Sequence, residues 1–424
     1  MCVEAAPPPS SRLTRRGVLA GAAALAGTVT VASPASASRR GTERGGTERG
    51  GDLVIQGGTL LDPATGDVTE DSVVVIEGGV VRAAGPRARV AVPKGAKTLG
   101  AHGKWVLPGL VDAHIHLSTA AEARDAVRAG VTSARSGSTN FYQDIAVREL
   151  ARRLPARAPR LRAAGVFVTP DLGDTVLADP DLTPLARLRD GVRSAEALRR
   201  VVEVNLARGA DVIKTRVNER AGLPDQDPLT QVYSREQLSE VVAAARRGGK
   251  GVLCHSYSEK GCHDAVTAGV LSLEHGAFVG ERTLHEMRRR GTYFTPTLTA
   301  IAGLAASSDP VLAERGRAYL PVLKRAVLAA HELGVELAAG TDSSGGKVVP
   351  VGREVELMRE AGLPALDAIR TATTAAARLL GVERTVGRLA RGFAGDAIVV
   401  DGDPLADVSV LKTPVRVVRA GVAV

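Results

Sequence analysis

The stretch VLPGLVDAHIHL, residues 106–117, places two histidines at the end of an apolar run. We interpret this run as a short β-strand. Because side chains alternate along a strand, His114 and His116 lie on the same face and both imidazoles point the same way. Two imidazoles so placed can hold one metal ion. The stretch therefore predicts a strand with a metal site at its C-terminal end.

Residues 109–381 alternate between strand candidates and helical stretches. The helical stretches include SREQLSEVVAAARRGG, ERTLHEMRRRG and ERGRAYLPVLKRAVLAAHELG. Eight strands that alternate with helices predict an α/β fold of the (β/α)8 TIM-barrel type. The strand candidates begin near Leu110, Val131, Leu161, Ala210, Gly251, Leu271, Tyr293 and Glu336.

Side chains that can bind a metal ion fall at the C-terminal ends of several predicted strands. Catalytic groups of (β/α)8 barrels lie at these ends, so the side chains are expected to converge on one site. The other histidines do not follow this rule, because His102 lies in a predicted turn and His263, His285 and His331 lie on helical stretches. The candidate ligands are His114, His116, Lys214, His255, His275 and Asp342.

Lys214, in the stretch GADVIKTRVN (residues 209–218), is the least usual candidate. We interpret Ala210 to Val217 as a strand on which Lys214 and Arg216 share one face. A lysine is rarely buried unless another group pairs with it. Asp211 is near in sequence but points to the opposite face of the strand, so it is a poor partner.

Both ends of the chain are strand-like, with Gly-Gly pairs that indicate turns. Neither residues 52–108 nor residues 382–424 are numerous enough to bury a good core alone. We therefore expect one small domain, a β-sandwich, built from both ends of the chain.

The N-terminus, residues 1–37, has the organisation of an export signal: a basic region, an apolar run and an A-x-A site at Ala35–Ala37. The stretch TRRGVL, residues 14–19, is similar to a twin-arginine signal. An ordinary secretory signal with two chance arginines also fits. Either signal predicts a secreted protein that meets the export machinery in transit.

Residues 38–51 and the overall composition carry two further expectations. The repeated unit GTERG has no apolar residue, so residues 38–51 are expected to be a Gly-rich linker. The formal net charge is +9, but the basic residues are spread along helical stretches and only 3% of residues are aromatic. Stacking platforms for bases are therefore scarce, and we expect no nucleic-acid partner.

The order of these motifs resembles the amidohydrolase superfamily, and within it the prolidase-like and imidazolonepropionase-like hydrolases. The resemblance rests on LPGLVDAHIHL, GADVIK, the strand before His255, EHG, GTD and GDAIVVDGDPLAD, and runs from about residue 52 to the end. It implies two divalent metal ions, usually zinc, bridged by Lys214 after carbon dioxide has carboxylated it to a carbamate. The other implied ligands are His114, His116 and Asp342 for one ion, and His255 and His275 for the other.

Carboxylation would explain a lysine at this position. Burial lowers the pKa of a lysine, so the neutral amine that reacts with carbon dioxide forms easily. The resulting carbamate is an anionic oxygen ligand that divalent metals accept. An ammonium group among metal cations would instead be repelled.

The expected activity is cleavage of an amide or peptide C–N bond by a metal-bound hydroxide, on an Xaa-Pro-type dipeptide or an N-acyl amino acid. Asp342 would move the proton from the hydroxide to the leaving amine. Arg216 would hold a substrate carboxylate, or cap a loop at the surface. Tyr257 would donate to the carbonyl oxygen, or pack at the barrel rim. The loop SGSTNFYQD, residues 136–144, departs from the acidic, glycine-rich loop expected in this branch, so the substrate stays open.

Other functions fit parts of the sequence. A one-metal cyclic-amide hydrolase or deaminase of the imidazolonepropionase type generally lacks the bridging lysine and works in the cytoplasm. A lactone or organophosphate hydrolase would use the same hydroxide. A barrel that only binds a ligand would be expected to have lost some of the metal ligands. The native metal, the number of subunits in a homo-oligomer, and a disulfide between Cys254 and Cys262 also stay open.

Overall fold

The computed structural model describes residues 50–173 and 179–424. The predicted export signal, residues 1–37, and all of the predicted linker except Gly50 and Gly51 lie outside the described residues. Within the described part, no helix is both long enough and apolar enough to cross a membrane.

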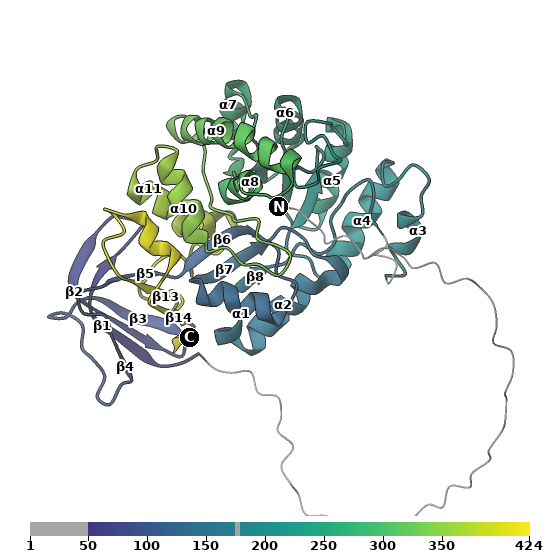
Figure 1. Ribbon diagram of the computed structural model, residues 1–424. Coiled ribbons are helices and arrows are strands. Elements are labelled where there is room, and N and C mark those ends of the chain that lie inside the picture. The colour runs from purple at the N-terminus through teal and green to yellow at the C-terminus, as the bar shows by residue number, and fades with distance from the viewer. Residues whose placement is uncertain (1–49, 174–178) are drawn as a thin grey trace, which may run out of the picture. The chain divides into compact units, whose positions relative to one another are not determined.

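Strands from both ends of the chain form one sheet, which Figure 1 shows as purple and yellow arrows side by side. The N-terminal strands pair with the C-terminal ones through β5, which runs parallel to β1 and antiparallel to β13. The order in the described residues is β15-β14-β13-β5-β1-β2-β3, with β4 beside β1. These strands are β1 (Leu53–Leu61), β2 (Val68–Glu77), β3 (Val80–Pro86), β4 (Thr98–Gly100), β5 (Trp105–Pro108), β13 (Ala397–Val400), β14 (Arg416–Arg419) and β15 (Val422–Ala423).

The prediction of a β-sandwich from the two chain ends is wrong, because their strands are hydrogen-bonded into a single mixed sheet rather than two sheets. Both ends do share one core. Ile55 and Val74 from the N-terminal part pack in one buried cluster with Val399 and Val418 from the C-terminal part. Each end thus supplies apolar surface that the other end covers.

Parallel strands continue from β5 and are joined into a ring. They form one sheet in the order β6-β7-β8 and another in the order β12-β11-β10-β9. On one side, the amide of Val168 donates to the carbonyl of Lys214 (2.9 Å) and links the two sheets. On the other side, the amide of Ala113 donates to the carbonyl of Ala339 (2.8 Å), and the segment of Ala339 bridges to β12 through Leu337 and Phe294. The strands are β6 (Leu110–Ile115), β7 (Val131–Ser136), β8 (Arg160–Arg162), β9 (Ile213–Arg216), β10 (Val252–Ser256), β11 (Ser272–His275) and β12 (Tyr293–Thr295).

Helices follow most of these strands, as the alternating pattern predicts. Figure 1 shows α1 and α2 beside β7 and β8, with which they are in contact. Polar caps begin several of them, for example Ser234, whose side chain forms a capping box with Gln237. The α-helices are α1 (Ala120–Arg128), α2 (Gln143–Arg153), α3 (Thr183–Ala186), α4 (Ala195–Ala207), α5 (Arg235–Arg247), α6 (Glu259–Ala268), α7 (Glu281–Arg290), α8 (Leu298–Ala305), α9 (Pro310–Glu332), α10 (Val351–Glu360), α11 (Ala365–Thr371) and α12 (Thr374–Leu379). The 3-10 helices in the described part of the chain are η1 (Asn140–Tyr142), η2 (Pro155–Arg157) and η4 (Val408–Lys412).

Two predicted strands are shorter than expected. The strand predicted over Ala210 to Val217 is reduced to Ile213–Arg216, because the amides of Asp211 and Val212 both donate to the carbonyl of Ala163 and leave the ladder. The strand predicted from Glu336 is reduced to an isolated bridge between Leu337 and Phe294.

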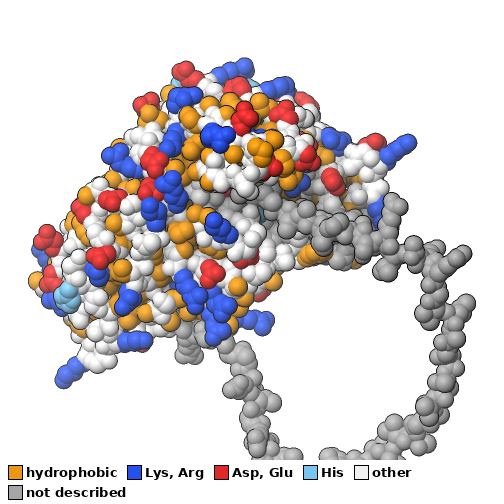
Figure 2. Space-filling model, in the orientation of Figure 1, with side chains coloured by type: hydrophobic (Ala, Val, Ile, Leu, Met, Phe, Trp, Pro, Cys, Tyr) orange, Lys and Arg blue, Asp and Glu red, His pale blue; other side chains and the backbone are white. Residues whose placement is uncertain are grey.

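Charged side chains are mixed on the face of the molecule that Figure 2 shows, where blue basic groups alternate with red acidic ones. The surplus of positive charge in the sequence is therefore not gathered into one patch on this face.

Candidate metal centre

Strand β6 carries His114, and His116 lies directly after its last residue. The rings of His114 and His116 have centroids 5.6 Å apart, as expected for one strand face. Nδ1 of His114 lies 2.6 Å from Oε2 of Glu274, and Nδ1 of His116 lies 2.7 Å from the carbonyl oxygen of Ser138. With Nδ1 of each ring engaged in this way, Nε2 is the nitrogen that each ring presents to a metal ion.

Asp342 brings a carboxylate to the same point. Its Oδ1 lies 3.5 Å from Nε2 of His114 and 3.0 Å from Nε2 of His116. Its backbone amide donates to the carbonyl of His114 (2.7 Å). This hydrogen bond holds the loop of Asp342, which follows the bridge at Leu337, beside β6. The ligand atoms of the three residues all lie within 4.8 Å of one another. Two imidazoles and a carboxylate are a donor set that zinc accepts.

Gly137 borders the space that these nitrogens face. A Cβ atom built on Gly137 would lie 2.5 Å from Nε2 of His114 and 2.6 Å from Nε2 of His116. A zinc ion would need to lie about 2.1 Å from each nitrogen, so only a glycine keeps this volume open. The donor set and the open volume together fit a metal ion.

We expect Gly137→Ala to lower metal affinity by about tenfold or more, because the new methyl group occupies the volume that the ion needs. The backbone of Gly137 is not left-handed, so alanine is tolerated there by the main chain. Metal content per chain after dialysis against defined zinc concentrations measures the effect. Gly100→Ala is the matched control, since its Cβ would be 3.5 Å from its nearest neighbour. Wild-type metal content in Gly137→Ala would contradict the placement of the site.

Lys214 is fully buried, and its Nζ lies 3.2 Å from Nε2 of His114. It is the second residue of β9 rather than the last, which corrects the expected position at the strand end. Asp211 does not pair with it. The carboxylate of Asp211 lies 2.7 Å from Nη1 of Arg148, so the lysine faces the metal-binding side chains instead.

His255 and His275 complete the set of six that the structure brings together. Their ring centroids lie 4.5 Å apart, and the His275 ring lies 5.4 Å from that of His114. Nε2 of His255 lies 3.0 Å from the carbonyl oxygen of Glu219. Nδ1 of His275 lies 2.6 Å from the hydroxyl of Thr297.

The backbone is strained at these positions. His275 and Asp342 have φ angles of 67° and 54°, and Thr297, which contacts His275, has a φ of 51°. Non-glycine residues pay roughly 1–2 kcal/mol each for the left-handed conformation. Such strain is concentrated at functional sites, where surrounding contacts impose it.

Glu274 and Arg135 belong to the centre but were missed by the sequence reasoning. Glu274 is fully buried and accepts hydrogen bonds from Arg135 (2.9 Å) and from Nδ1 of His114. Burial raises the pKa of Glu274, but Arg135 and His114 outweigh it and hold that pKa well below its usual range. The ionised carboxylate thereby orients the His114 ring. An arginine in the otherwise apolar and small run VTSARS was the available signal.

Asp112 supports the same strand end from the other side. Its carboxylate accepts the amide of His114 (3.0 Å) and the hydroxyl of Thr341 (2.7 Å), so it ties β6 to the loop of Asp342. Burial raises its pKa to about 6. Its position two residues before His114 in VDAHIH placed it on the ligand-bearing face, which was the overlooked signal.

The two residues predicted to contact the substrate, Arg216 and Tyr257, lie in different environments. Arg216 is buried rather than on the surface, and it donates to Glu219 (2.6 Å) and to Thr169 (2.8 Å). Burial lowers its pKa. The Tyr257 ring stacks on His275 at 5.3 Å and meets His255 edge-on at 5.0 Å, so it adjoins the centre.

The structure also shows the loop of residues 136–144 and the two cysteines of the described chain. Phe141 is 52% exposed, and Phe141 and Tyr142 both have left-handed backbones, which turns their side chains away from regular helix positions. Cys254 and Cys262 are both buried free thiols, so the predicted alternative of a disulfide is not found.

Comparison with known proteins identifies the family of this chain. Residues 105–424 match the Amidohydrolase family, and the chain belongs to that family. An ochratoxinase from Aspergillus niger is 31% identical over 233 residues, which are 54% of this chain and 48% of that protein. The chain thus spans about half the length of this relative. A dihydroorotase from Anaeromyxobacter dehalogenans is 28% identical over 82% of this chain and 88% of its own.

Solved structures agree with the family. A Xaa-Pro dipeptidase with bound methionine in the active site has a TM-score of 0.78 at 25% identity, over 88% of this chain and 99% of its own. A putative prolidase from Bifidobacterium longum has a TM-score of 0.77 at 26% identity, over 89% and 95%. The resemblance to prolidase-like amidohydrolases that the motifs indicate is confirmed.

Proposed function

We propose that this chain is a secreted hydrolase that cleaves an amide or peptide C–N bond with two divalent metal ions, of which zinc suits the donor set best. The observation that carries the proposal is Lys214, fully buried, with Nζ 3.2 Å from Nε2 of His114 and no contact to Asp211. A buried lysine beside a metal-binding imidazole is explained by carboxylation. The ring of parallel strands would then be the (β/α)8 barrel of the family.

The ligands divide into two groups in this proposal. His114, His116 and Asp342 would hold one ion, since their ligand atoms already converge. His255 and His275, with adjacent rings, would hold the other. Carboxylated Lys214 would bridge the two ions.

The mechanism assigns one task to each group of side chains. Two bound cations would acidify the attacking water and polarise the scissile carbonyl. Asp342 would take the proton from that water and pass it to the leaving amine. Glu274 and the carbonyl of Ser138 fix the tautomers of His114 and His116, so that both rings keep their geometry during turnover.

Two further residues would address the substrate. Tyr257, stacked on His275, would donate its hydroxyl to the carbonyl oxygen of the scissile bond. Arg216 uses Nε for Thr169 and Nη1 for Glu219, so Nη2 is the donor it would offer to a substrate carboxylate. A carboxylate at this position suits a dipeptide or an N-acyl amino acid, and the dipeptidase neighbour favours Xaa-Pro dipeptides as the first class to test.

The test combines metal analysis with a substrate panel on the mature chain from Ser38 onward. We expect close to two metal ions per chain and hydrolysis of Xaa-Pro dipeptides or N-acyl amino acids that a chelator abolishes and added zinc restores. One metal ion per chain, with turnover only of cyclic amides or aminated heterocycles, would replace the proposal by the one-metal alternative. Turnover of lactones or organophosphates alone would contradict the C–N bond assignment.

Secretion rests on the first 37 residues and is tested separately. The full-length chain should be recovered outside the inner membrane with an N-terminus near Ser38, and replacing Arg15 and Arg16 by lysine should block its export. Unchanged export of this variant would favour an ordinary secretory signal.

A further inference from the structure

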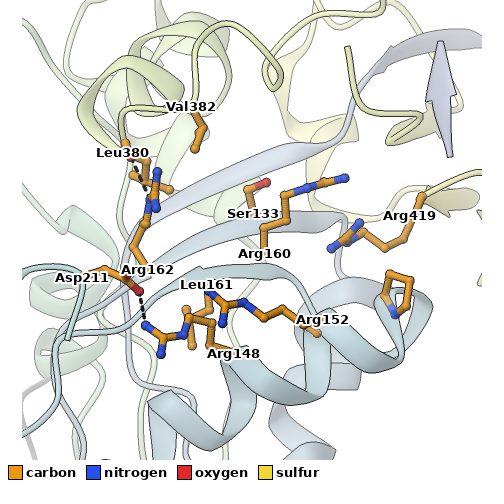
Figure 3. A pocket seen from close by; sticks show the side chains of 13 residues that line it. Ser133, Arg148, Arg152, Arg160, Leu161, Arg162, Asp211, Leu380, Val382 and Arg419 are labelled. Atoms are coloured by element: carbon orange, nitrogen blue, oxygen red, sulfur yellow. Dashed lines mark hydrogen bonds and ion pairs between the residues drawn. The ribbon is translucent and has the colours of Figure 1, made fainter. Parts of the chain in front are cut away.

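A second cavity lies at the opposite end of the parallel strands from the metal centre. Its volume is about 360 Å³, and its lining includes residues from the first half of β7, from β8 and from β14 (Figure 3). Ser133 lines this cavity, whereas Gly137, just past the end of the same strand, borders the metal centre. Four residues of strand separate the two by roughly 13 Å. The cavity is therefore a separate place on the molecule.

Arginines dominate the lining. Among the lining residues, the one carboxylate is Asp211, which is paired with Arg148 at 2.7 Å. Asp396, which does not line the cavity, pairs with Arg160 and Arg419. Glu149, also outside the lining, pairs with Arg148 and Arg152. Five guanidinium groups thus face three carboxylates, so the cavity keeps a positive surplus. The five are Arg148, Arg152, Arg160, Arg162 and Arg419.

Two buried polar groups in this lining have no hydrogen-bond partner among the described residues. One is Nε of Arg419, a residue that is 2% exposed, and the other is Oγ of Ser133, which is 1% exposed. Among the described residues, Arg419 forms one ion pair, a long one of 3.4 Å from Nη1 to Asp396. Burial, only partly offset by Asp396, lowers the pKa of Arg419 to about 10. Buried polar groups are normally satisfied, so these two require an explanation.

Two arginines of the lining, Arg160 and Arg419, lie near each other, and their like charges favour an anion between them. Arg160 lies close enough to Arg419 that its charge contributes to lowering the pKa of Arg419, and Figure 3 shows both beside Ser133. An oxyanion between these side chains would accept hydrogen bonds from all three and offset the repulsion. The rest of the lining is apolar, with Leu161 and Val382 among its members, and could cover a carbon framework.

The geometry points to a binding site for a small organic anion, whose phosphate or carboxylate oxygens would accept hydrogen bonds from Arg419 and Ser133. The site is independent of the metal centre and of the proposed hydrolysis. Its volume falls within the range of small-molecule pockets.

The molecule offers a matched control. A cavity of the same volume, about 360 Å³, is lined by Arg246, Arg289 and Arg290, and so is also rich in arginine. There, Arg289 and Arg290 are both paired with Glu286. None of the described residues that line it has a buried polar atom without a partner. It should therefore not compete for the anion.

Calorimetric titration of the mature protein with inorganic phosphate tests the site. We expect Arg160→Ala to weaken phosphate binding by about tenfold, since it removes one of the three donors that surround the anion and its side chain is 37% exposed. Ser133→Ala should weaken it by about fivefold. Arg246→Ala should leave it unchanged. His116→Ala should also leave it unchanged, which excludes binding of the phosphate at the metal centre.

Thermal unfolding of Ser133→Ala separates a ligand-binding role from a structural one. Without an anion, the variant should melt no lower than wild type, because the hydroxyl that it loses has no partner. With saturating phosphate, wild type should gain more than the variant. Phenyl phosphate and benzoate, titrated in parallel, distinguish a phosphate from a carboxylate ligand. Absence of binding by all three anions, or binding that neither Ser133→Ala nor Arg160→Ala weakens, would overturn the inference.

Discussion

Lys214→Ala is expected to lose most of the bound metal and to lower turnover by about a thousandfold or more, equivalent to roughly 4 kcal/mol of activation free energy. The residue is fully buried against His114, so its removal takes away the proposed bridging ligand and leaves nothing in its place. Metal content per chain and kcat/KM on the best dipeptide measure both effects. Lys260→Ala is the matched control, because this lysine is an exposed residue of α6.

Two further measurements separate carboxylation from a simple lysine contact. Lys214→Arg keeps a positive charge but cannot form the carbamate, so it should lose metal as the alanine variant does. Wild-type protein prepared with ¹³C-labelled bicarbonate should show a carbamate carbon that both variants lack. If Lys214→Ala kept two metal ions per chain, or if wild type showed no labelled carbamate, the bridging role of Lys214 would be wrong.

Asp342→Asn is expected to keep most of the metal but to lower kcat by about a thousandfold. The amide oxygen can still ligate an ion beside His114 and His116, whereas it cannot take a proton from the attacking water. Metal content and kcat, measured on the same preparation, test the two halves of this expectation. Asp125→Asn, at an exposed position of α1, controls for the loss of one negative charge.

Metal content and activity of Asp342→Asn, compared with each other, distinguish a ligand from a proton-transfer group. Loss of activity together with loss of metal would make Asp342 a ligand whose carboxylate charge is needed for binding. Activity within tenfold of wild type, with metal retained, would exclude Asp342 as the group that moves the proton.

The convergence of the candidate metal ligands could be predicted from sequence because these residues follow a local rule. His114 and His116 share a strand face by simple alternation, and His255 and His275 lie at the C-terminal part of strands whose apolar runs are easy to recognise. In a parallel ring all these ends lie on one side, so position along each strand was enough to predict convergence. The same reasoning placed Lys214 on the correct face, although not at the end of β9.

The fold of the two chain ends was predictable only in part. Short apolar runs indicate strands and imply that the ends must share a core. They do not indicate how many sheets result, because this depends on which edge of β5 each end meets, and β5 accepts β1 on one side and β13 on the other.

By itself, then, the sequence determined the alternation of strands and helices, the residue types of the candidate ligands and the strand face that each of them occupies. Only the tertiary structure decided that Glu274 orients His114 across 160 residues, that Gly137 leaves room between two imidazole nitrogens, and that Ser133 and Arg419 meet in a second cavity. The physical reason is the range of the interactions. Periodicity and turn chemistry act over a few residues, whereas these contacts depend on the side chains that strand order and ring closure bring together.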